Sequence, residues 1–245
     1  MRTVVIVQAR MTSTRLPGKV LKEVLGKPLL EYLVERLRRV RLADAFAIAT
    51  TTNETDLPIV ELCERLGVPV TRGSEHDVLA RYYEAARFMR ADVVVRTTSD
   101  CPLIDPAVID DVIGFFAGHR ERYDYVSNAL TPSYPYGMPA EILPFGLLEQ
   151  AHREAAAPPE REHVTPFIYT RPERFRIGHV VHPEDLSHHR WTVDTAEDFE
   201  LVRRIIEALH PAAPEFGLRD ILAVLDEHPD WSTINAHVRQ KKLGE

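Results

Sequence analysis

Short runs of β-branched residues alternate with amphipathic segments through the first half of this 245-residue chain, and this alternation most limits the possible folds. Residues 4–7 read VVIV, which is typical of a strand buried on both faces. A helix is expected over 29–40, where leucine and valine recur at helical spacing. Further strands are expected at 45–50, 68–70 and 93–95, and further helices at 59–66, 78–89 and 106–116. The pattern predicts a mostly parallel sheet with helices on both faces.

The second half of the chain is less regular. Strands are expected over 123–127 and 176–181, and the proline- and glycine-rich stretch 128–144 between them is interpreted as a loop. Thr195 and Asp198 form a capping box that starts a helix reaching Leu209. Without an internal repeat or a low-complexity linker, we predict one domain over 1–245, with a nucleotide half at about 1–118 and an acceptor-side half at about 119–245.

Charge and cysteine content exclude several classes of protein. The formal net charge of -7 gives no general attraction to nucleic acid or to an anionic membrane, so a local cluster must hold any anionic ligand. Cys63 and Cys101 form no C-x-x-C pair, which argues against a disulfide framework and a structural zinc site. No apolar run is long enough for a signal peptide or a membrane span. We therefore expect a cytoplasmic protein without a membrane partner.

A basic loop follows the first predicted strand. Residues 10–19 contain Arg10, Arg15 and Lys19 together with small hydroxyl residues and Gly18. Charged donors bind phosphate oxygens strongly, and glycine lets backbone N–H groups approach them, so the loop suits a polyphosphate. A solvated basic loop is the alternative interpretation. The loop matches neither the P-loop nor G-x-G-x-x-G, which argues against a Walker-type NTPase and a dinucleotide enzyme.

Two carboxylates follow predicted strand-like segments, where ligands collect in an open α/β sheet. Asp100 comes after strand 93–95 in a turn that Pro102 restricts, and Asp194 ends the short run 190–193. Carboxylate oxygens together with substrate phosphates suit Mg²⁺. A turn or cap role for Asp100 and helix capping for Asp194 remain alternatives, although Thr195 already offers the cap. With the basic loop, the two carboxylates predict a magnesium–nucleotide site.

Residues 5–21, VIVQARMTSTRLPGKVL, resemble the N-terminal signature of the CTP-dependent enzymes that activate sugar acids. Within that group the chain is most similar to the spore coat polysaccharide biosynthesis protein F family, which is related to the cytidylyltransferases for 3-deoxy-manno-octulosonate and N-acetylneuraminate. The resemblance continues in order through 72–74, 77–82, 100–102, 161–166 and 190–198. It therefore covers nearly the whole chain.

This resemblance implies a nucleotide-diphospho-sugar transferase fold, GT-A or Rossmann-like, which is a three-layer α/β/α sandwich. It places Arg15 and Lys19 on the β- and γ-phosphates and makes Asp100 and Asp194 the ligands of Mg²⁺. It places Arg72 near the cytosine and ribose. The predicted nucleotide-binding residues are Ala9, Arg10, Arg15, Lys19, Arg72 and Ser99.

Candidate acceptor-binding residues lie in the second half of the chain. They are Glu141, Glu162, His163 and Arg190. Related sequences usually have an aspartate where this chain has Pro139, which leaves Glu141 as the acid of that loop. Glu162 and His163 are expected to open a helical stretch over 162–169, where they either contact an acceptor or cap and pack the helix.

The resemblance and the predicted site together indicate a cytidylyltransferase for surface polysaccharide biosynthesis. An acceptor oxygen would attack the α-phosphorus of CTP and release pyrophosphate, with Arg15, Lys19 and Asp100 as the catalytic residues. A glycosyltransferase of the same fold is one alternative, but it normally holds its metal with D-x-D, which is absent from this sequence. A non-catalytic nucleotide-binding assembly protein is the other alternative. Such a protein could lose residues of the catalytic site, but the basic loop and both carboxylates are present in this sequence. Related enzymes suggest a homodimer.

Overall fold

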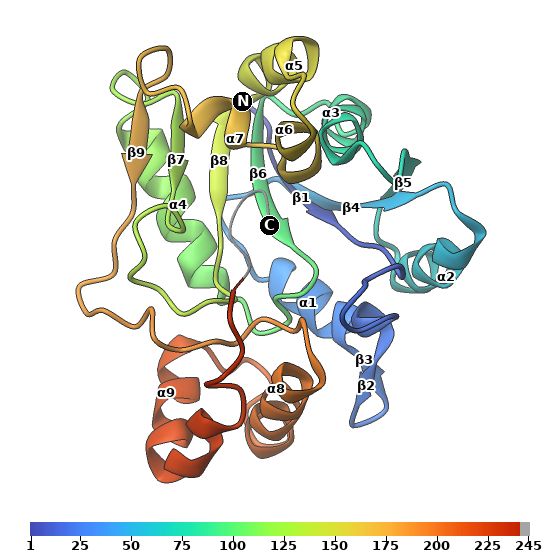
Figure 1. Cartoon of the computed structure of the whole chain (residues 1–245), viewed down its shortest axis with the longest axis vertical. Coiled ribbons are helices and arrows are strands. Elements are labelled where there is room, and N and C mark those ends of the chain that lie inside the picture. Colours follow the sequence, from blue (N-terminus) through green and yellow to red (C-terminus); the bar gives the residue numbers. More distant parts are fainter. Residues whose placement is uncertain (241–245) are drawn as a thin grey trace.

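A seven-stranded sheet forms the centre of the computed structural model, which describes residues 1–240 (Figure 1). The strand order is β5-β4-β1-β6-β8-β7-β9. Pairing is parallel from β5 through β6 and between β7 and β9, whereas β8 is antiparallel to both of its neighbours. The mostly parallel sheet is confirmed. The strands are β1 (Thr3–Gln8), β4 (Ala45–Thr51), β5 (Val70–Gly73), β6 (Val93–Thr98), β7 (Tyr125–Ser127), β8 (Glu141–Pro144) and β9 (Ile177–His179), and a separate hairpin consists of β2 (Glu23–Val24) and β3 (Lys27–Pro28).

Helices cover both faces of this sheet, because successive side chains of a strand point to opposite faces. On β1, Val5 and Val7 belong to one hydrophobic core cluster, while Val4 and Ile6 belong to the other. The first face is covered by α1 (Leu29–Leu37), α2 (Leu57–Leu66) and α4 (Pro106–Gly118), and α8 (Ala196–Leu209) and α9 (Leu218–Glu227) extend the same hydrophobic core cluster. The second face is covered by α3 (Val78–Phe88), α5 (Phe145–Glu154), α6 (Pro158–His163) and α7 (Pro166–Tyr169). The predicted three-layer α/β/α sandwich is confirmed.

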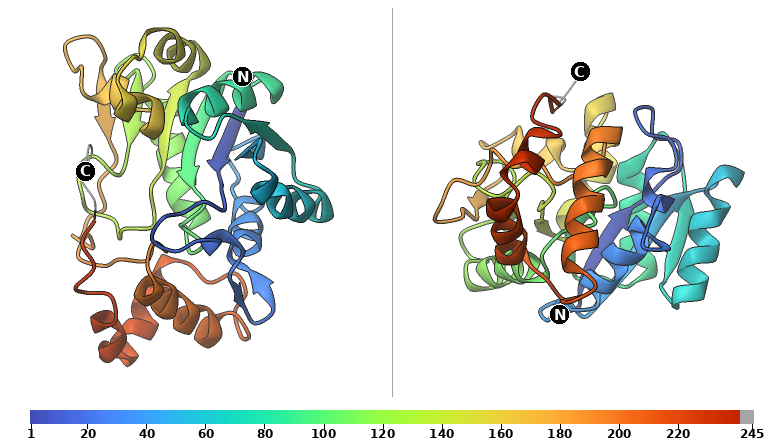
Figure 2. Two further views of the ribbon diagram at one scale, coloured as in Figure 1. Left: turned by 45° about the vertical axis from the view of Figure 1, so that its right-hand side comes forward. Right: turned by 90° about the horizontal axis from the view of Figure 1, so that it is seen from below.

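Local start signals behave as the sequence predicts. The Asp105 side chain accepts a hydrogen bond from the Ala107 N–H and caps α4, whose first residue is Pro106. Thr195 and Asp198 form the predicted capping box of α8. Figure 2 shows α8 beside α9, below the strands in its left-hand view. The residues at which α4 and α8 begin therefore follow from capping by side chains a few residues away.

Several predicted strand boundaries are wrong. Strand β5 runs over 70–73 instead of 68–70, so Arg72 is a strand residue, and β7 and β9 are shorter than predicted. Strand β6 continues to Thr98, so Arg96 is a strand residue that pairs in register with Glu141 and not part of a loop. Residues 141–144, expected within a loop, form β8. Residues 141–144 have no alternating pattern that predicts a strand. They form one because they pair with β6 and β7 in the folded chain.

Two further boundaries differ near the predicted acceptor residues. Helix α6 ends at His163, because Val164 adopts a positive φ of 75° and Pro166 then restricts Thr165, so Glu162 and His163 close a helix instead of opening one. Residues 190–193, directly before Asp194, form no named strand, although an isolated bridge joins Tyr136 and Arg190. Hydrogen bonds to neighbouring segments hold residues 190–194 instead.

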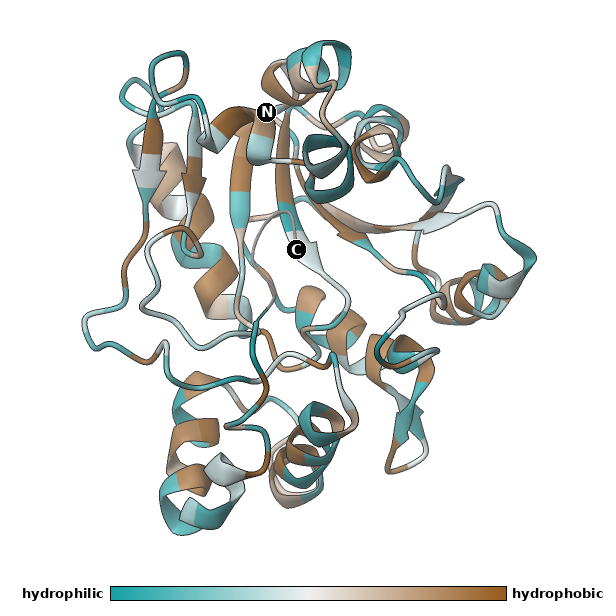
Figure 3. Cartoon of the chain, in the orientation of Figure 1, coloured by the Kyte–Doolittle hydropathy of each residue, from teal (hydrophilic) through white to brown (hydrophobic). Residues whose placement is uncertain are grey.

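The two predicted halves of the chain share the sheet. Strands β5, β4, β1 and β6 come from the first half, and β8, β7 and β9 come from the second. Figure 3 shows hydrophobic colours on the inner strands and hydrophilic colours on much of the outer helix surfaces. None of the helices within residues 1–240 combines the length and apolar character that a membrane span requires. The division into a nucleotide half and an acceptor half stays a prediction.

Candidate functional site

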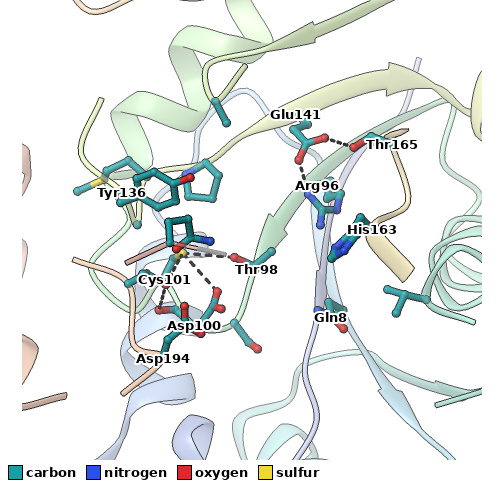
Figure 4. Close-up of a pocket in the computed structure, with 18 of the residues that line it drawn as sticks. Gln8, Arg96, Thr98, Asp100, Cys101, Tyr136, Glu141, His163, Thr165 and Asp194 are labelled. Atoms are coloured by element: carbon teal, nitrogen blue, oxygen red, sulfur yellow. Dashed lines mark hydrogen bonds and ion pairs between the residues drawn. The ribbon is translucent and has the colours of Figure 1, made fainter. Parts of the chain in front are cut away.

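A cleft of about 750 Å³ opens where β1, β6 and β8 meet (Figure 4). Residues of the basic loop line one part of it, and the end of β6, residues 127–139 and helix α6 line the rest. The carboxyl ends of parallel strands meet at one edge of a sheet, which is where open α/β folds bind their ligands. The position of the cleft therefore agrees with the predicted position of the site.

Lys19 lies between the two predicted metal-binding carboxylates. Its Nζ is 3.1 Å from Asp100 Oδ2 and 2.8 Å from Asp194 Oδ1. Arg15 Nη2 lies 2.9 Å from Asp194 Oδ2. The four residues of the predicted catalytic and metal-binding set are therefore joined by ion pairs in the cleft, Lys19 to both carboxylates and Arg15 to Asp194.

The backbone of the basic loop explains why Lys19 reaches this point. Gly18 has a φ of 67°, which favours glycine, and its N–H donates to the Met11 carbonyl at 2.9 Å. The Met11 N–H in turn donates to Asp56 Oδ1 at 2.7 Å. The loop is thus closed on itself and attached to the segment after β4, and Lys19 begins a short 3₁₀ helix that directs it to the carboxylates.

Electrostatics keeps the central groups charged. Burial favours neutral Lys19, but Asp100 and Asp194 outweigh it and raise the Lys19 pKa. Burial also works against ionised Asp100, yet the charge of Lys19 and a hydrogen bond from Thr98 hold its pKa below the ordinary value. Lys19 and Asp100 are therefore both charged at neutral pH.

Arg190 holds Asp194 without lining the cleft in the described chain. Its Nη2 donates to Asp194 Oδ2 at 3.0 Å, and its guanidinium also donates to both oxygens of Asp198, at 2.8 and 3.0 Å. Asn235 Nδ2 donates to Asp198 Oδ1 at 2.8 Å and to the Arg190 carbonyl at 2.9 Å. These contacts give Arg190 a positioning role toward Asp194, while contact of Arg190 with an acceptor stays a prediction.

The donor set fits a divalent cation of the magnesium type. Asp100 Oδ2 and Asp194 Oδ1 both contact the Lys19 ammonium, so the two oxygens face one common point. Within residues 1–240, no group of three or more histidine, cysteine, aspartate or glutamate side chains is arranged to hold a metal. Magnesium is commonly held by one or two carboxylates plus substrate phosphates and water, whereas a structural zinc site needs four protein ligands.

Of the other predicted nucleotide-binding residues, two line the cleft and two are not among its lining residues in the described chain. Arg10 and Ser99 line it. Ala9 is buried, and its N–H donates to the Ala49 carbonyl at 3.1 Å. Arg72 donates to the carbonyls of Thr51 and Asn53 and is not among the residues that line the cleft in the described chain. A contact between Arg72 and the base stays a prediction.

Three of the four predicted acceptor-side residues form a second polar cluster in the same cleft, whereas Arg190 does not line it in the described chain. Glu162 and His163 line it from the end of α6, and burial lowers the pKa of His163. Glu141 also lines it and pairs with Arg96 of β6. Sequence reasoning placed Arg96 directly after the strand 93–95 and gave it no function. The available signal was a charged residue directly after the buried run of valines at 93–95.

The sequence profile of the family described as "Cytidylyltransferase" matches residues 4–218. The chain belongs to this cytidylyltransferase family. It is 33% identical to the spore coat polysaccharide biosynthesis protein SpsF of Bacillus subtilis over 93% of this chain and 95% of that protein. A cytidylyltransferase structure from Leptospira borgpetersenii is 31% identical, with a TM-score of 0.90, and covers 99% of both chains.

A more distant structure shares the cytidylyltransferase fold. It is described as CMP:2-keto-3-deoxy-manno-octonic acid synthetase complexed with CTP. At 17% identity it has a TM-score of 0.63 and covers 85% of this chain and 99% of that one. The family match ends at residue 218, so the C-terminal segment lies beyond it. That segment reaches the cleft of this cytidylyltransferase, because Gln240 lines the cleft and accepts a hydrogen bond from Arg190 Nη1 at 2.6 Å.

Proposed function

We propose that this cytidylyltransferase transfers CMP from CTP to a sugar-type acceptor, in particular a sugar acid, and releases pyrophosphate. The observation that carries the proposal is the contact of Lys19 with both Asp100 and Asp194, next to Arg15, in one cleft. Such a cluster combines phosphate-binding cations with a pair of carboxylates suited to a divalent cation. Family membership supports nucleotidyl transfer as the reaction type.

The transfer is a substitution at phosphorus. The acceptor oxygen attacks the α-phosphorus, the bond from that phosphorus to the oxygen bridging to the β-phosphate breaks, and pyrophosphate leaves with the electron pair. The proton of the acceptor hydroxyl passes to water. Arg10, Arg15 and Lys19 stabilise the negative charge that grows on pyrophosphate, because fixed donors in a cleft act more strongly than solvent. Positioning and electrostatics dominate such reactions, so a dedicated protein base is not required.

Asp100 and Asp194 would hold Mg²⁺, and the bound ion would neutralise and polarise the α-phosphate. Lys19 now occupies the point that both carboxylates face. Its side chain belongs to the same basic loop as Arg15, so it is placed to contact phosphate oxygens once it leaves the carboxylates. Arg190 keeps Asp194 oriented during this exchange.

The relatives support the acceptor class. SpsF is named for spore coat polysaccharide biosynthesis, and the CTP-bound structure of the same fold is a synthetase acting on a 3-deoxy sugar acid. A related role in surface polysaccharide biosynthesis is therefore part of our proposal. The cytoplasmic location and the homodimer stay predictions.

The test is pyrophosphate release from CTP and magnesium with a panel of sugar acids and sugar phosphates. We expect release that depends on both an acceptor and a divalent cation. Asp100→Asn should lower the rate by about 10²- to 10³-fold, the loss typical when one electrostatic group of a transition-state site is removed. Asp226→Asn, an exposed change on α9, serves as the matched control.

Two results would argue against the proposal. An unchanged rate in folded Asp100→Asn would remove the metal assignment. Turnover of nucleotide sugars without pyrophosphate release would favour a glycosyltransferase, and binding of CTP without turnover of any acceptor would favour an assembly protein.

A further inference from the structure

Arg96 has donor capacity that the described chain does not fill. It lines the acceptor side of the cleft with 13% of its side chain exposed. Its Nη1 donates to Glu141 Oε1, but its buried Nε has no partner and its Nη2 makes no hydrogen bond within residues 1–240. A guanidinium carries five N–H donors and stays charged in proteins. Nη2 is not among the buried unpartnered atoms of the described chain, so it is the donor of this side chain that a further acceptor atom can reach.

Glu141 is occupied and holds Arg96 in place. Its Oε2 accepts hydrogen bonds from the Tyr125 hydroxyl at 2.7 Å and the Thr165 hydroxyl at 2.5 Å, while Oε1 accepts from Arg96. Only 6% of Glu141 is exposed. Three donors from β6, β7 and the start of α7 therefore fix this carboxylate. Figure 4 shows Arg96 between Glu141 and the part of the cleft that contains Gln8 and Thr98.

The distribution of charge makes Arg96 the cation of the acceptor side. The lysine and arginine residues among those that line the cleft in the described chain are Arg10, Arg15, Lys19 and Arg96, and the first three belong to the basic loop and its 3₁₀ helix. Burial lowers the pKa of His163, which keeps that side chain neutral at pH 7. Glu162 adds a negative charge. An anionic group on the acceptor therefore has Arg96 as its available counterion.

We propose that Arg96 binds the carboxylate of the acceptor through Nη2, with Glu141 as the residue that positions the guanidinium. This inference rests on the proposed transfer of CMP to a sugar acid and names the residue that would select the acid. A planar guanidinium matches carboxylate geometry, and charge-assisted hydrogen bonds are stronger than neutral ones. The acid should therefore be a better acceptor than the same sugar with an uncharged carboxamide.

Paired acceptors test this selection. The pairs are 3-deoxy-manno-octulosonate and N-acetylneuraminate, each with its own carboxamide, and kcat/KM for pyrophosphate release is measured for each. We expect wild-type protein to prefer the acid by about 10- to 100-fold, as one hydrogen bond to a charged group predicts. Arg96→Gln should lose the preference without a change in the KM for CTP. Arg96→Lys, which keeps the charge, should restore part of it.

Binding without turnover gives a second readout. Saturation-transfer NMR with CTP and without divalent cation should detect the acid on wild-type protein and lose it in Arg96→Gln, with folding checked by circular dichroism. Equal use of acid and carboxamide by wild-type protein, or an acid preference that survives in Arg96→Gln, would overturn the assignment. If no acceptor reacts with CTP, the proposed function fails, and acid-selective binding then decides the role of Arg96 by itself. The wild-type comparison of acid and carboxamide needs no variant.

Discussion

Lys19 Nζ lies 2.8 Å from Asp194 Oδ1, so a cation near the N-terminus neutralises a carboxylate 175 residues further along the chain. The same ammonium group also contacts Asp100, across 81 residues. Removal of one partner from a buried ion pair costs more than the pair contributes, because a charge is then left without compensation. Lys19 is therefore important for the folded state as well as for the proposed chemistry.

Lys19→Met should leave Asp100 without a cationic partner in the described chain, whereas Asp194 keeps Arg15 and Arg190. We expect a loss of about 3–5 kcal/mol in the free energy of unfolding without divalent cation, the range found when a buried pair is broken. Because a cation can then occupy the point that both carboxylates face, Mg²⁺ or Mn²⁺ should raise the melting temperature of the variant more than that of the wild type. Thermal unfolding with and without the ions measures this. Lys22→Met is the control. An equal rise in melting temperature with the ions in both variants would disprove that Lys19 and the divalent cation occupy the same position.

Asn235→Ala should weaken the hold on Asp194 from a distance. Asn235 donates to Asp198 and to the Arg190 carbonyl, and Arg190 contacts Asp194. Loss of these two hydrogen bonds removes the side-chain donor to the part-buried Arg190 carbonyl, while Asp198 Oδ1 keeps its bond from Arg190 Nε, and a buried acceptor left unpaired costs about 1–3 kcal/mol. We expect a lower urea midpoint and a lower kcat with the affinity for CTP retained. Ser232→Ala, an exposed change in the same segment, is the control, and an unchanged kcat in a destabilised Asn235→Ala would limit this residue to a structural role.

Gly137→Ala should disturb the segment that carries Asp194. Gly137 has a φ of 114°, and an added Cβ would lie 2.6 Å from the Trp191 carbonyl carbon and 2.8 Å from the Thr192 nitrogen. A strained backbone conformation costs about 1–3 kcal/mol before the clash is counted. Urea unfolding should show the loss. Gly146→Ala is the matched control, because its added Cβ meets nothing within 4 Å in helix α5, so it should be neutral or stabilising. Equal midpoints for the two variants would refute this account.

His163 should make stability depend on pH. Its folded-state pKa is lowered by burial below the ordinary value of 6.5. The unfolded chain therefore binds a proton at higher pH than the folded chain, and the free energy of unfolding decreases as pH falls through 6.5 and below. His163→Gln should reduce this decrease, measured by urea unfolding between about pH 7.5 and about pH 5.5. The exposed His76→Gln should leave it unchanged, and identical pH profiles for both variants would count against the burial of His163.

Patterns along the sequence were sufficient to predict the layers of this protein and two parts of its candidate site, the basic loop and Asp100. The valine run of β1, the periodic helices and the caps at Asp105 and Thr195 depend on neighbours a few residues away, so local chemistry was sufficient to predict them. The basic loop and Asp100 were found in the same way, because parallel strands bring their carboxyl ends to one edge. The family signature in 5–21 added the reaction type.

Only the tertiary structure decided which side chains touch. Glu141 was expected as an acid in a loop, yet it is a strand residue held by Arg96, Tyr125 and Thr165 from three different elements. Arg190 contacts Asp194 because Asp198, which Asn235 holds, orients its guanidinium. Such contacts join residues far apart in the sequence and depend on strand pairing and loop closure. A local sequence pattern therefore cannot predict these contacts, which form only when the folded chain brings each charge to its partner.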